Sequence, residues 1–245
     1  MDSLLILKGG YMLLGLDVGG TFTDAVIIDA HRVVATAKRR TTKDNLMNGI
    51  GEALDAVLEG YDTSNIEQVT LSTTVVTNTI VEAKEQVVDL YVITGPGRNV
   101  DDIFPVEPIY LQGYTDHRGI VVERTPADAV RGIANMVQAR SGTDLAAVSA
   151  KFGVRNPQEE LSITEELKNT YHTISNGSLL SGSLNFPRRT ISAYFNSAVT
   201  PVFTVFKKNV EDALSARNIL APLHILKADG GSLPMEHMVL SLIHI

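Results

Sequence analysis

The strongest constraint on the fold lies at residues 13–29, which read LLGLDVGGTFTDAVIID. Apolar side chains dominate the runs 13–18 and 25–29, and each run has the length of a buried strand. The connection between them is short and begins with Gly19-Gly20, so the two strands are predicted to fold back on each other as a hairpin. A third strand-like run at 33–38 follows another short turn. The chain is therefore predicted to begin with an antiparallel β-meander.

The connection inside this hairpin carries groups that suit a bound phosphate. Gly19 and Gly20 have no Cβ atoms, so their backbone N–H groups can turn toward an anion and let it come close. Thr21 and Thr23 add hydroxyl donors to the same stretch. Together these four residues predict a phosphate-binding turn.

Two carboxylates flank the turn and suggest a metal ion. Asp17 would repel a phosphate by itself, but it becomes a favourable neighbour if it holds Mg²⁺ directly or through water. Asp24 could share that metal. A lone glycine pair more commonly marks an ordinary hairpin with a capping aspartate. The complete string D-x-G-G-T-x-T-D favours the phosphate and metal interpretation.

Beyond residue 40 the pattern alternates between helices and strands, which is typical of an α/β protein. Apolar residues at helical spacing mark the first helix, and a proline near its start marks the third. The predicted helices are 41–58, 74–84, 126–140, 157–172 and 188–216, the last one broken near Pro201. The predicted strands are 68–71, 87–93, 119–123, 145–148 and 223–228, with a polar connection at 175–185.

Composition narrows the function classes without choosing one. With 245 residues and 44% hydrophobic content, the chain can bury the core of one large or two modest domains. A net charge of −7 argues against a nucleic-acid partner, and no apolar run is long enough to span a membrane. The absence of cysteine excludes disulfides and a thiol nucleophile and fits a cytoplasmic protein. The six histidines lack the close spacing of a zinc site.

Four motifs, in chain order, resemble those of one protein family. Residues 17–24 resemble the first phosphate motif of the superfamily of actin, sugar kinases and heat-shock chaperone ATPases, and within it that of the hydantoinase/oxoprolinase family. Residues 71–78 are similar to the S-T-T-x-x-T-N segment of that family, and residues 151–157 to its K-F-x-V-R-N-P segment. Residues 227–231 resemble the second phosphate loop of the same ATPase fold.

The resemblance implies a fold and a domain division. The fold would be an α/β, actin-like ATPase lobe of the ribonuclease H-like type, with a mixed sheet that starts with the antiparallel meander and is flanked by helices. Residues 1–185 would form the N-terminal domain of the family, and residues 186–245 the start of its catalytic domain. The two phosphate loops of this fold belong to two lobes, one each. By resemblance, an S-G-P-A-like segment and a glycine motif that binds adenosine would lie beyond the second loop, so the chain is expected to be an N-terminal fragment, truncated before the second lobe is complete. The missing lobe would leave apolar surface exposed around residues 202–206 and at the C-terminal tail.

The resemblance also implies an activity. ATP would phosphorylate the amide oxygen of a small cyclic amide or imide, such as a hydantoin, an N-methylhydantoin or 5-oxoproline, and the activated ring would then be hydrolysed. Mg²⁺ would accompany ATP, and the partner would be a second subunit of the hydantoinase B type. Carboxylases related to the family are a close variant.

Each matched motif would then have a role in the site. Asp17 would anchor Mg²⁺ with Asp24 as a second candidate, and Asp229 would approach from the other lobe as a further catalytic carboxylate. The residues that hold ATP would be Gly19, Gly20, Thr21, Thr23, Gly230 and Gly231. The residues that face the substrate or phosphate cleft would be Thr73, Thr74, Thr77 and Asn78, although helix capping explains these four nearly as well.

Two other functions stay open at the level of the sequence. A sugar kinase would need an aspartate base in a helix-start motif, and no such motif matches. An inactive fragment with an incomplete cleft could bind nucleotide without turning any substrate over. ATP consumption that depends on ring amides, on sugars or on neither would separate the three functions.

Overall fold

The computed structural model describes residues 11–41, 46–97, 101–240 and 242, which form two compact units. Unit 1 contains the described residues up to Val81 together with Val202–Val239. Unit 2 contains Glu82–Pro201 together with the described residues of Leu240–Ile243. Unit 2 is therefore inserted into the sequence of unit 1, and helix α6 (Phe186–Ser215) has residues in both.

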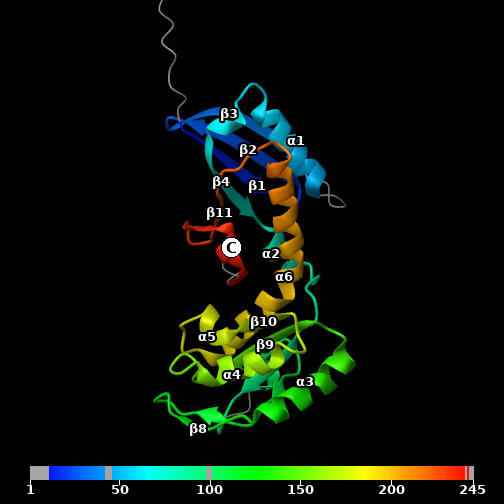
Figure 1. The fold of residues 1–245 in the computed structure, drawn as a ribbon, viewed down its shortest axis with the longest axis vertical. Coiled ribbons are helices and arrows are strands. Elements are labelled where there is room, and N and C mark those ends of the chain that lie inside the picture. The colour runs from blue at the N-terminus through cyan, green and yellow to red at the C-terminus, as the bar shows by residue number, and fades with distance from the viewer. Residues whose placement is uncertain (1–10, 42–45, 98–100, 241, 243–245) are drawn as a thin grey trace, which may run out of the picture. The chain divides into compact units, whose positions relative to one another are not determined.

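Unit 1 is built on a six-stranded mixed sheet with the strand order β12-β11-β4-β1-β2-β3 (Figure 1). The strands β1, β2 and β3 pair antiparallel in succession, so the predicted meander is confirmed. The strand β4 then joins β1 in parallel, and β11 joins β4 in parallel. The strand bounds are Met12–Val18 (β1), Phe22–Asp29 (β2), Arg32–Arg40 (β3), Ile66–Thr73 (β4), Leu223–Leu226 (β11) and Ser232–Pro234 (β12).

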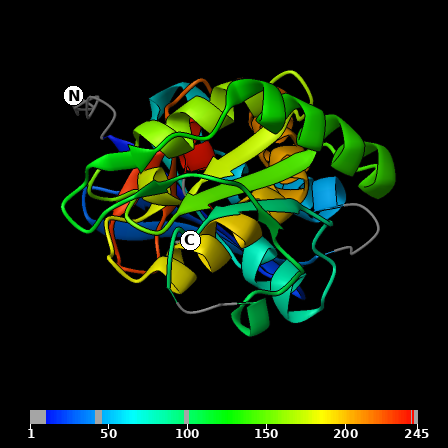
Figure 2. The same cartoon turned by 90° about the horizontal axis from the view of Figure 1, so that it is seen from below.

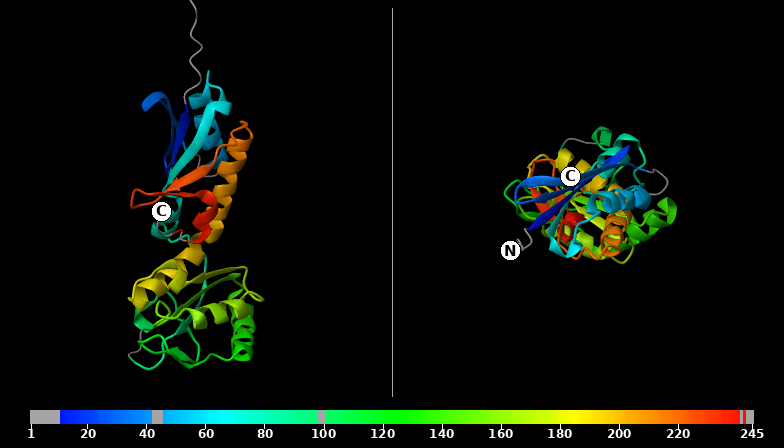
Figure 3. Two further views of the ribbon diagram at one scale, coloured as in Figure 1. Left: turned by 60° about the vertical axis from the view of Figure 1, so that its left-hand side comes forward. Right: turned by 90° about the horizontal axis from the view of Figure 1, so that it is seen from above.

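Alternation along these strands buries one face of the sheet. In β1 the side chains of Leu14, Leu16 and Val18 are buried, while Asp17 between them is exposed. Helix α1 (Leu46–Leu58) packs against β2 and β3 and buries its own apolar stripe. Figure 3 shows α1 and the C-terminal part of α6 beside this sheet. The short helices of unit 1 are η1 (Thr63–Asn65), α2 (Val75–Val81) and η3 (Met235–Leu240).

Unit 2 is built on a four-stranded parallel sheet with the order β10-β9-β5-β6 (Figure 2). The central strands β5 and β9 are buried along their whole length, as expected for parallel strands that are covered on both faces. One core contains Val148 and Leu167, and a second contains Leu90 and Tyr194. The strand bounds are Asp89–Ile93 (β5), Ile109–Tyr110 (β6), Tyr114–Thr115 (β7), Val121–Glu123 (β8), Leu145–Ala150 (β9) and Thr173–Asn176 (β10). The helices are η2 (Asp101–Ile103), α3 (Ala127–Ser141), α4 (Gln158–Leu167) and α5 (Gly177–Leu180).

Three predicted segments need correction. The predicted break near Pro201 is wrong, because α6 continues through the proline from Phe186 to Ser215. Proline removes one backbone hydrogen bond, but Ala198 and Phe203 on either side are buried, so packing holds the helix together. The predicted helix at 157–172 ends at Leu167, and part of the predicted connection at 175–185 is instead β10 and α5.

The apolar surface predicted around residues 202–206 and in the tail is also largely wrong. Phe203 and Phe206 are each only 1% exposed, because their spacing of three residues turns both rings to the same buried side of α6. Val205 points outward and is 62% exposed. In the described part of the tail, Met238 and Leu242 are buried.

Residues 42–45, at the start of the first predicted helix, lie outside the described residues. The predicted domain division between residues 185 and 186 follows family segments and differs from the compact units, so it stays a prediction. None of the helices that the structure describes is long and apolar enough to cross a membrane.

Candidate functional site

The motifs of unit 1 come together at one edge of its sheet. The strands β1, β4 and β11 are parallel neighbours, so their carboxyl ends lie at the same edge. The glycine turn follows β1, Thr74 follows β4, and the loop 227–231 follows β11. Ligands of α/β sheets bind beyond the carboxyl ends of such strands. This edge is therefore the candidate site of unit 1.

One prediction about this edge is wrong. Asp229, Gly230 and Gly231 were expected to approach from a second lobe. The structure places them between β11 and β12, which belong to the same sheet as β1. The reason is long-range pairing: β11 adds to β4 across more than a hundred residues of intervening sequence.

The turn after β1 is held closely by its neighbours. The Gly19 amide donates to the Phe22 carbonyl at 3.0 Å, and the Thr41 amide donates to the Thr21 carbonyl at 2.9 Å. A Cβ atom on Gly20 would lie 3.1 Å from the Asn78 side-chain nitrogen. Neither glycine has a positive φ. Neither glycine is therefore in the left-handed conformation, and the close approach of Asn78 on α2 leaves little room for a side chain at position 20.

Part of the polar segment at the end of β4 stabilises the fold. The Thr73 hydroxyl donates to the Val18 carbonyl at 2.9 Å and accepts from the Val75 amide at 3.2 Å. Thr73 thus ties the end of β4 to the end of β1 and caps α2, as the alternative interpretation proposes. Thr74 and Thr77 are exposed, and the Asn78 amide group donates to the Thr74 hydroxyl at 3.1 Å.

Asp17 belongs to a row of polar side chains that crosses four strands. It lies opposite Asp24 on β2 and opposite Ser72 on β4, and Asp24 lies opposite Lys38 on β3. Residues opposite one another share a face of the sheet. The Lys38 ammonium donates to the two Asp24 oxygens at 2.9 and 3.0 Å. Asp17 is exposed and has no hydrogen bond or ion pair to another described residue.

These carboxylates can be tested against the donor set that Mg²⁺ requires. Mg²⁺ usually keeps several waters and takes one or two carboxylates together with phosphate oxygens. Asp17 fits this pattern because both its oxygens are free. Asp24 fits less well because Lys38 already occupies both of its oxygens. In the part of the chain that the structure describes, no three histidine, aspartate or glutamate side chains gather as a complete metal cage.

The loop after β11 is a compact turn organised by an ion pair. The Lys227 ammonium donates to Asp229 Oδ2 at 2.7 Å, and the Gly231 amide donates to Asp229 Oδ1 at 2.9 Å. These hydrogen bonds, led by the one from Lys227, lower the pKa of Asp229, so the carboxylate stays ionised. Gly230 has a φ of +83°, which favours glycine at this position.

Sequence reasoning missed two residues of this edge. Lys227 lies in the matched segment 227–231, but the motif assigns it no function. A lysine beside an Asp-Gly-Gly turn is nevertheless a recognisable sign of a functional residue. Thr41 carried no signal at all. Thr23 is fully buried and its hydroxyl lies 3.1 Å from the Thr41 hydroxyl, so Thr23 braces the turn from below the sheet surface.

Comparison with known proteins gives the following matches. The family model described as "Hydantoinase/oxoprolinase N-terminal region" matches residues 13–171. The structure of an acetone carboxylase, solved nucleotide-free in a study of ATP-dependent acetone carboxylation, matches with a TM-score of 0.74 and 16% identity over 96% of this chain and 39% of that one. The ATP-dependent caprolactamase from Pseudomonas jessenii matches with a TM-score of 0.71 and 19% identity over 91% of this chain and 36% of that one. No curated protein sequence matches the chain.

The two structural matches confirm the predicted mixed α/β fold, and at these identities they speak for the fold alone. The chain spans less than two fifths of the length of either structure. The family model covers more than half of the chain and agrees with the family predicted from the motifs. The chain belongs to the hydantoinase/oxoprolinase family.

Proposed function

We propose that the protein is an ATP-dependent hydrolase of small cyclic amides or imides, and that this chain provides the site for the phosphates of the nucleotide. The observation that supports this most strongly is the convergence of three motif loops at one sheet edge beside Asp17, whose carboxylate is not paired with any described residue. Membership of the family and the ATP dependence of both structural neighbours agree with it.

In this proposal the residues at this edge have separate roles in binding Mg²⁺ and phosphate. Asp17 holds Mg²⁺, directly or through water, with Asp24 as a second candidate. The Gly20 backbone N–H group and the Thr21 hydroxyl contact phosphate oxygens, and Gly19, whose own N–H is bonded to the Phe22 carbonyl, lets the anion come close. When bound, ATP supplies the phosphoryl group that activates the amide oxygen of the ring, and Mg²⁺ neutralises charge on it.

The other candidate residues support or complete this arrangement. Thr23 acts through Thr41 to hold the turn, and Thr73 acts through the Val18 carbonyl to fix the end of β1. The exposed residues Thr74 and Thr77, with Asn78, are the candidates for substrate contact. Asp229, Gly230 and Gly231 bring a carboxylate and a glycine turn to the same edge. The Lys227 ammonium compensates the charge of Asp229, and the N–H groups of both glycines are bonded within the loop.

The ring substrate, the partner and the location belong to the same proposal. Hydantoin, N-methylhydantoin and 5-oxoproline are the ring types to test, and carboxylation is the variant that the acetone carboxylase neighbour suggests. A hydantoinase B-type subunit is the proposed partner, and the cytoplasm is the proposed compartment.

The test is substrate-dependent ATP consumption by the full protein with Mg²⁺. Each ring amide is supplied separately, glucose serves as the sugar-kinase arm, and a sample without added substrate gives the background. We expect ATP consumption only with a ring amide. The variant Asp17→Asn should lower the rate by about 100-fold or more, because it removes a metal ligand.

The matched control is Glu67→Gln, which removes a carboxylate from the exposed side of β4 near the opposite end of the strand. It should leave the rate unchanged. Sugar-dependent consumption, or a full rate in Asp17→Asn, would contradict the proposal.

A further inference from the structure

Unit 2 has a carboxyl edge of its own, between β5 and β9. From β5 the chain goes to β6 on one side of the sheet and later places β9 on the other side. The strands are parallel, so the loops after β5 and β9 leave the same edge and diverge there. Such a switch in strand order opens a crevice that α/β proteins use for ligands. None of the motifs assigned to the nucleotide lies at this edge.

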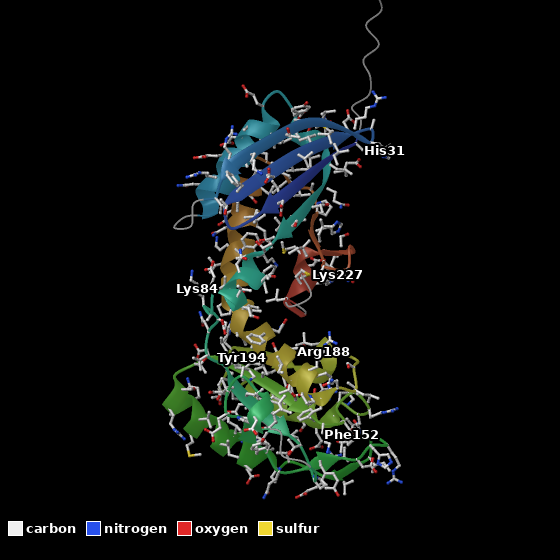
Figure 4. The ribbon with its side chains drawn as sticks, turned by 180° about the vertical axis from the view of Figure 1, so that it is seen from behind. His31, Lys84, Phe152, Arg188, Tyr194 and Lys227 are labelled. Carbon is white, nitrogen blue, oxygen red and sulfur yellow. The ribbon has the colours of Figure 1, made fainter. Side chains whose placement is uncertain are left out.

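A cavity of about 200 Å³ occupies this position. The loop after β5 contributes Pro96, the loop after β9 contributes Lys151 and Phe152, and the β7–β8 hairpin contributes Tyr114 and Thr115. All of these residues belong to unit 2, and Phe152 is labelled in Figure 4. The proline and the two rings give the cavity apolar walls. Its volume suits a ligand of about ten non-hydrogen atoms.

Lys151 brings an uncompensated positive charge to the cavity. Its ammonium donates to the Pro96 carbonyl at 3.1 Å and lies 5.8 Å from the centre of the Phe152 ring. No carboxylate of the described residues forms an ion pair with it. A Cβ atom on Gly97 would lie 2.8 Å from the ammonium nitrogen, so the loop after β5 wraps tightly around it. The site therefore offers a cation to an incoming anion.

Thr115 brings a buried polar group without a partner. The side chain is 5% exposed, and its hydroxyl has no hydrogen bond to another described residue. Leaving such a buried group unpaired is unfavourable. A ligand oxygen in the cavity would satisfy it.

The carboxylate at the cavity is already neutralised by its own loop. Asp116 accepts from the Arg118 guanidinium at 2.9 Å and from the backbone amides of Arg118 and Ile120, each at 2.9 Å. These interactions, led by the Ile120 amide, lower the pKa of Asp116 to about 2. Asp116 therefore neither pairs with Lys151 nor leaves a free negative charge that would repel an anion.

A buried charge network fixes the backbone that carries Lys151. The Arg189 guanidinium donates to the Ala150 carbonyl at 2.8 Å and to the Lys151 carbonyl at 3.3 Å. Glu160 Oε1 accepts from the Ala150 amide at 2.6 Å. Both charged side chains are fully buried. The network places Lys151 at the cavity without depending on a ligand, so the site is preorganised.

We propose that this cavity binds a small organic carboxylate with an apolar body, about the size of benzoate. The Lys151 ammonium contacts the carboxylate, the Thr115 hydroxyl donates to it, and the apolar body packs against Phe152, Tyr114 and Pro96. The site lies in a different unit from the nucleotide edge and needs no nucleotide, so it goes beyond the function proposed above.

The test uses the full chain and isothermal titration with sodium benzoate, without nucleotide. Benzamide is the matched neutral ligand, because it has the same body and no charge. We expect benzoate to bind at least about 10-fold more tightly than benzamide. Equal affinities, or no benzoate binding at millimolar concentrations, would overturn the proposal.

Variants then locate the bound carboxylate. Lys151→Met should weaken benzoate binding by about 10-fold or more, and Lys151→Arg should restore part of it. Thr115→Val should weaken binding by a few-fold without affecting folding, because the hydroxyl has no partner to lose. The control is Lys168→Met on the exposed surface of unit 2, which should change nothing. Unchanged affinity in Lys151→Met, or displacement of benzoate by Mg·ATP, would assign the binding to another site.

Discussion

At the scale of single residues, the space around a glycine decides whether a residue with a side chain could replace it. Gly20 faces the Asn78 amide group, and Gly153 faces the Glu160 carboxylate, where a Cβ atom would clash. Gly132 in α3 has no atom within 4 Å of the position a Cβ atom would take. The motif predicts Gly20 as a residue that lets an anion come close. Only the structure reveals that the Asn78 side chain also limits the space at this position.

Gly20→Ala tests this requirement. The added methyl group would lie 3.1 Å from Asn78 Nδ2, so the Asn78 side chain or the turn after β1 must give by a few tenths of an ångström. We expect Mg·ATP binding to weaken by about 10-fold, together with a loss of roughly 1 kcal/mol in the free energy of unfolding. Truncation of the neighbour in Gly20→Ala/Asn78→Ala should recover part of the stability. Titration calorimetry and urea unfolding measure the two effects.

Gly132→Ala is the matched control and should have the opposite sign. In the open interior of a helix, alanine is favoured over glycine by about 0.5–1 kcal/mol. Urea unfolding should therefore show a small gain in stability and no change in nucleotide binding. A loss of stability in Gly132→Ala, or none in Gly20→Ala, would contradict this interpretation of the glycines.

At the scale of elements, buried polar networks join the strands and helices of unit 2. Glu160 on α4 accepts from the Ala150 amide at the end of β9 at 2.6 Å and from the Ser178 amide of α5 at 2.8 Å. Burial raises the pKa of Glu160, and these hydrogen bonds oppose the rise. One side chain thus holds three elements in register.

Glu160→Gln should destabilise unit 2 by about 2–4 kcal/mol. The glutamine side chain has one acceptor oxygen, so one of the two backbone amides would face an NH₂ group, and buried Arg189 would lose its nearby negative charge. Urea unfolding measures the loss. The control Glu165→Gln, on the exposed side of the same helix, should change stability by less than about 0.5 kcal/mol. Equal stability of the two variants would contradict the proposed role.

The tyrosine pair beside β5 predicts a dependence on alkaline pH. The hydroxyls of Tyr91 and Tyr171 lie 2.7 Å apart, and Tyr171 donates to the Asp89 carboxylate at 2.8 Å. Burial raises the pKa of Tyr91 to about 12 and also raises that of Tyr171. A folded pKa above the unfolded one means that the stabilisation is complete below pH 10 and is lost as the pH rises from 10 toward 12.

Urea unfolding measured at several pH values between 9 and 11.5 tests whether stability is lost as the pH rises. The free energy of unfolding should fall above pH 10 by roughly 1.4 kcal/mol per pH unit for each raised tyrosine. The free energy of unfolding of Tyr91→Phe should fall less steeply with pH, because this variant has one tyrosine with a raised pKa fewer. Parallel curves for the two proteins would show that Tyr91 does not contribute.

Local patterns identified most elements, and the exceptions have physical causes. The meander and α1 follow from apolar spacing, and β4, β5 and β9 from short apolar runs. The strand β10 carries three polar residues among four and lies at the edge of the sheet beside β9, so its sequence has little strand character. The proline in α6 is a local signal for a break that burial on both sides overrides.

At the scale of the whole molecule, long-range pairing decides what the sequence could not. The motif residues were predictable one by one, but their convergence at one edge depends on β11 joining β4. No local pattern encodes that partner, so the loop 227–231 was assigned to another lobe. The same pairing makes unit 2 an insertion, with a sheet and a carboxyl edge of its own.

The central claim is that the loops after β1, β4 and β11 bind the phosphates of one nucleotide. Hydrogen exchange of the full chain, measured with and without saturating Mg·ATP, tests it most directly. We predict slower exchange in peptides that contain residues 19–23, 74–78 and 227–231, no change in peptides that contain 151–153, and loss of the effect in Asp17→Asn. Protection confined to unit 2, or protection of the first loop without the other two, would contradict the claim.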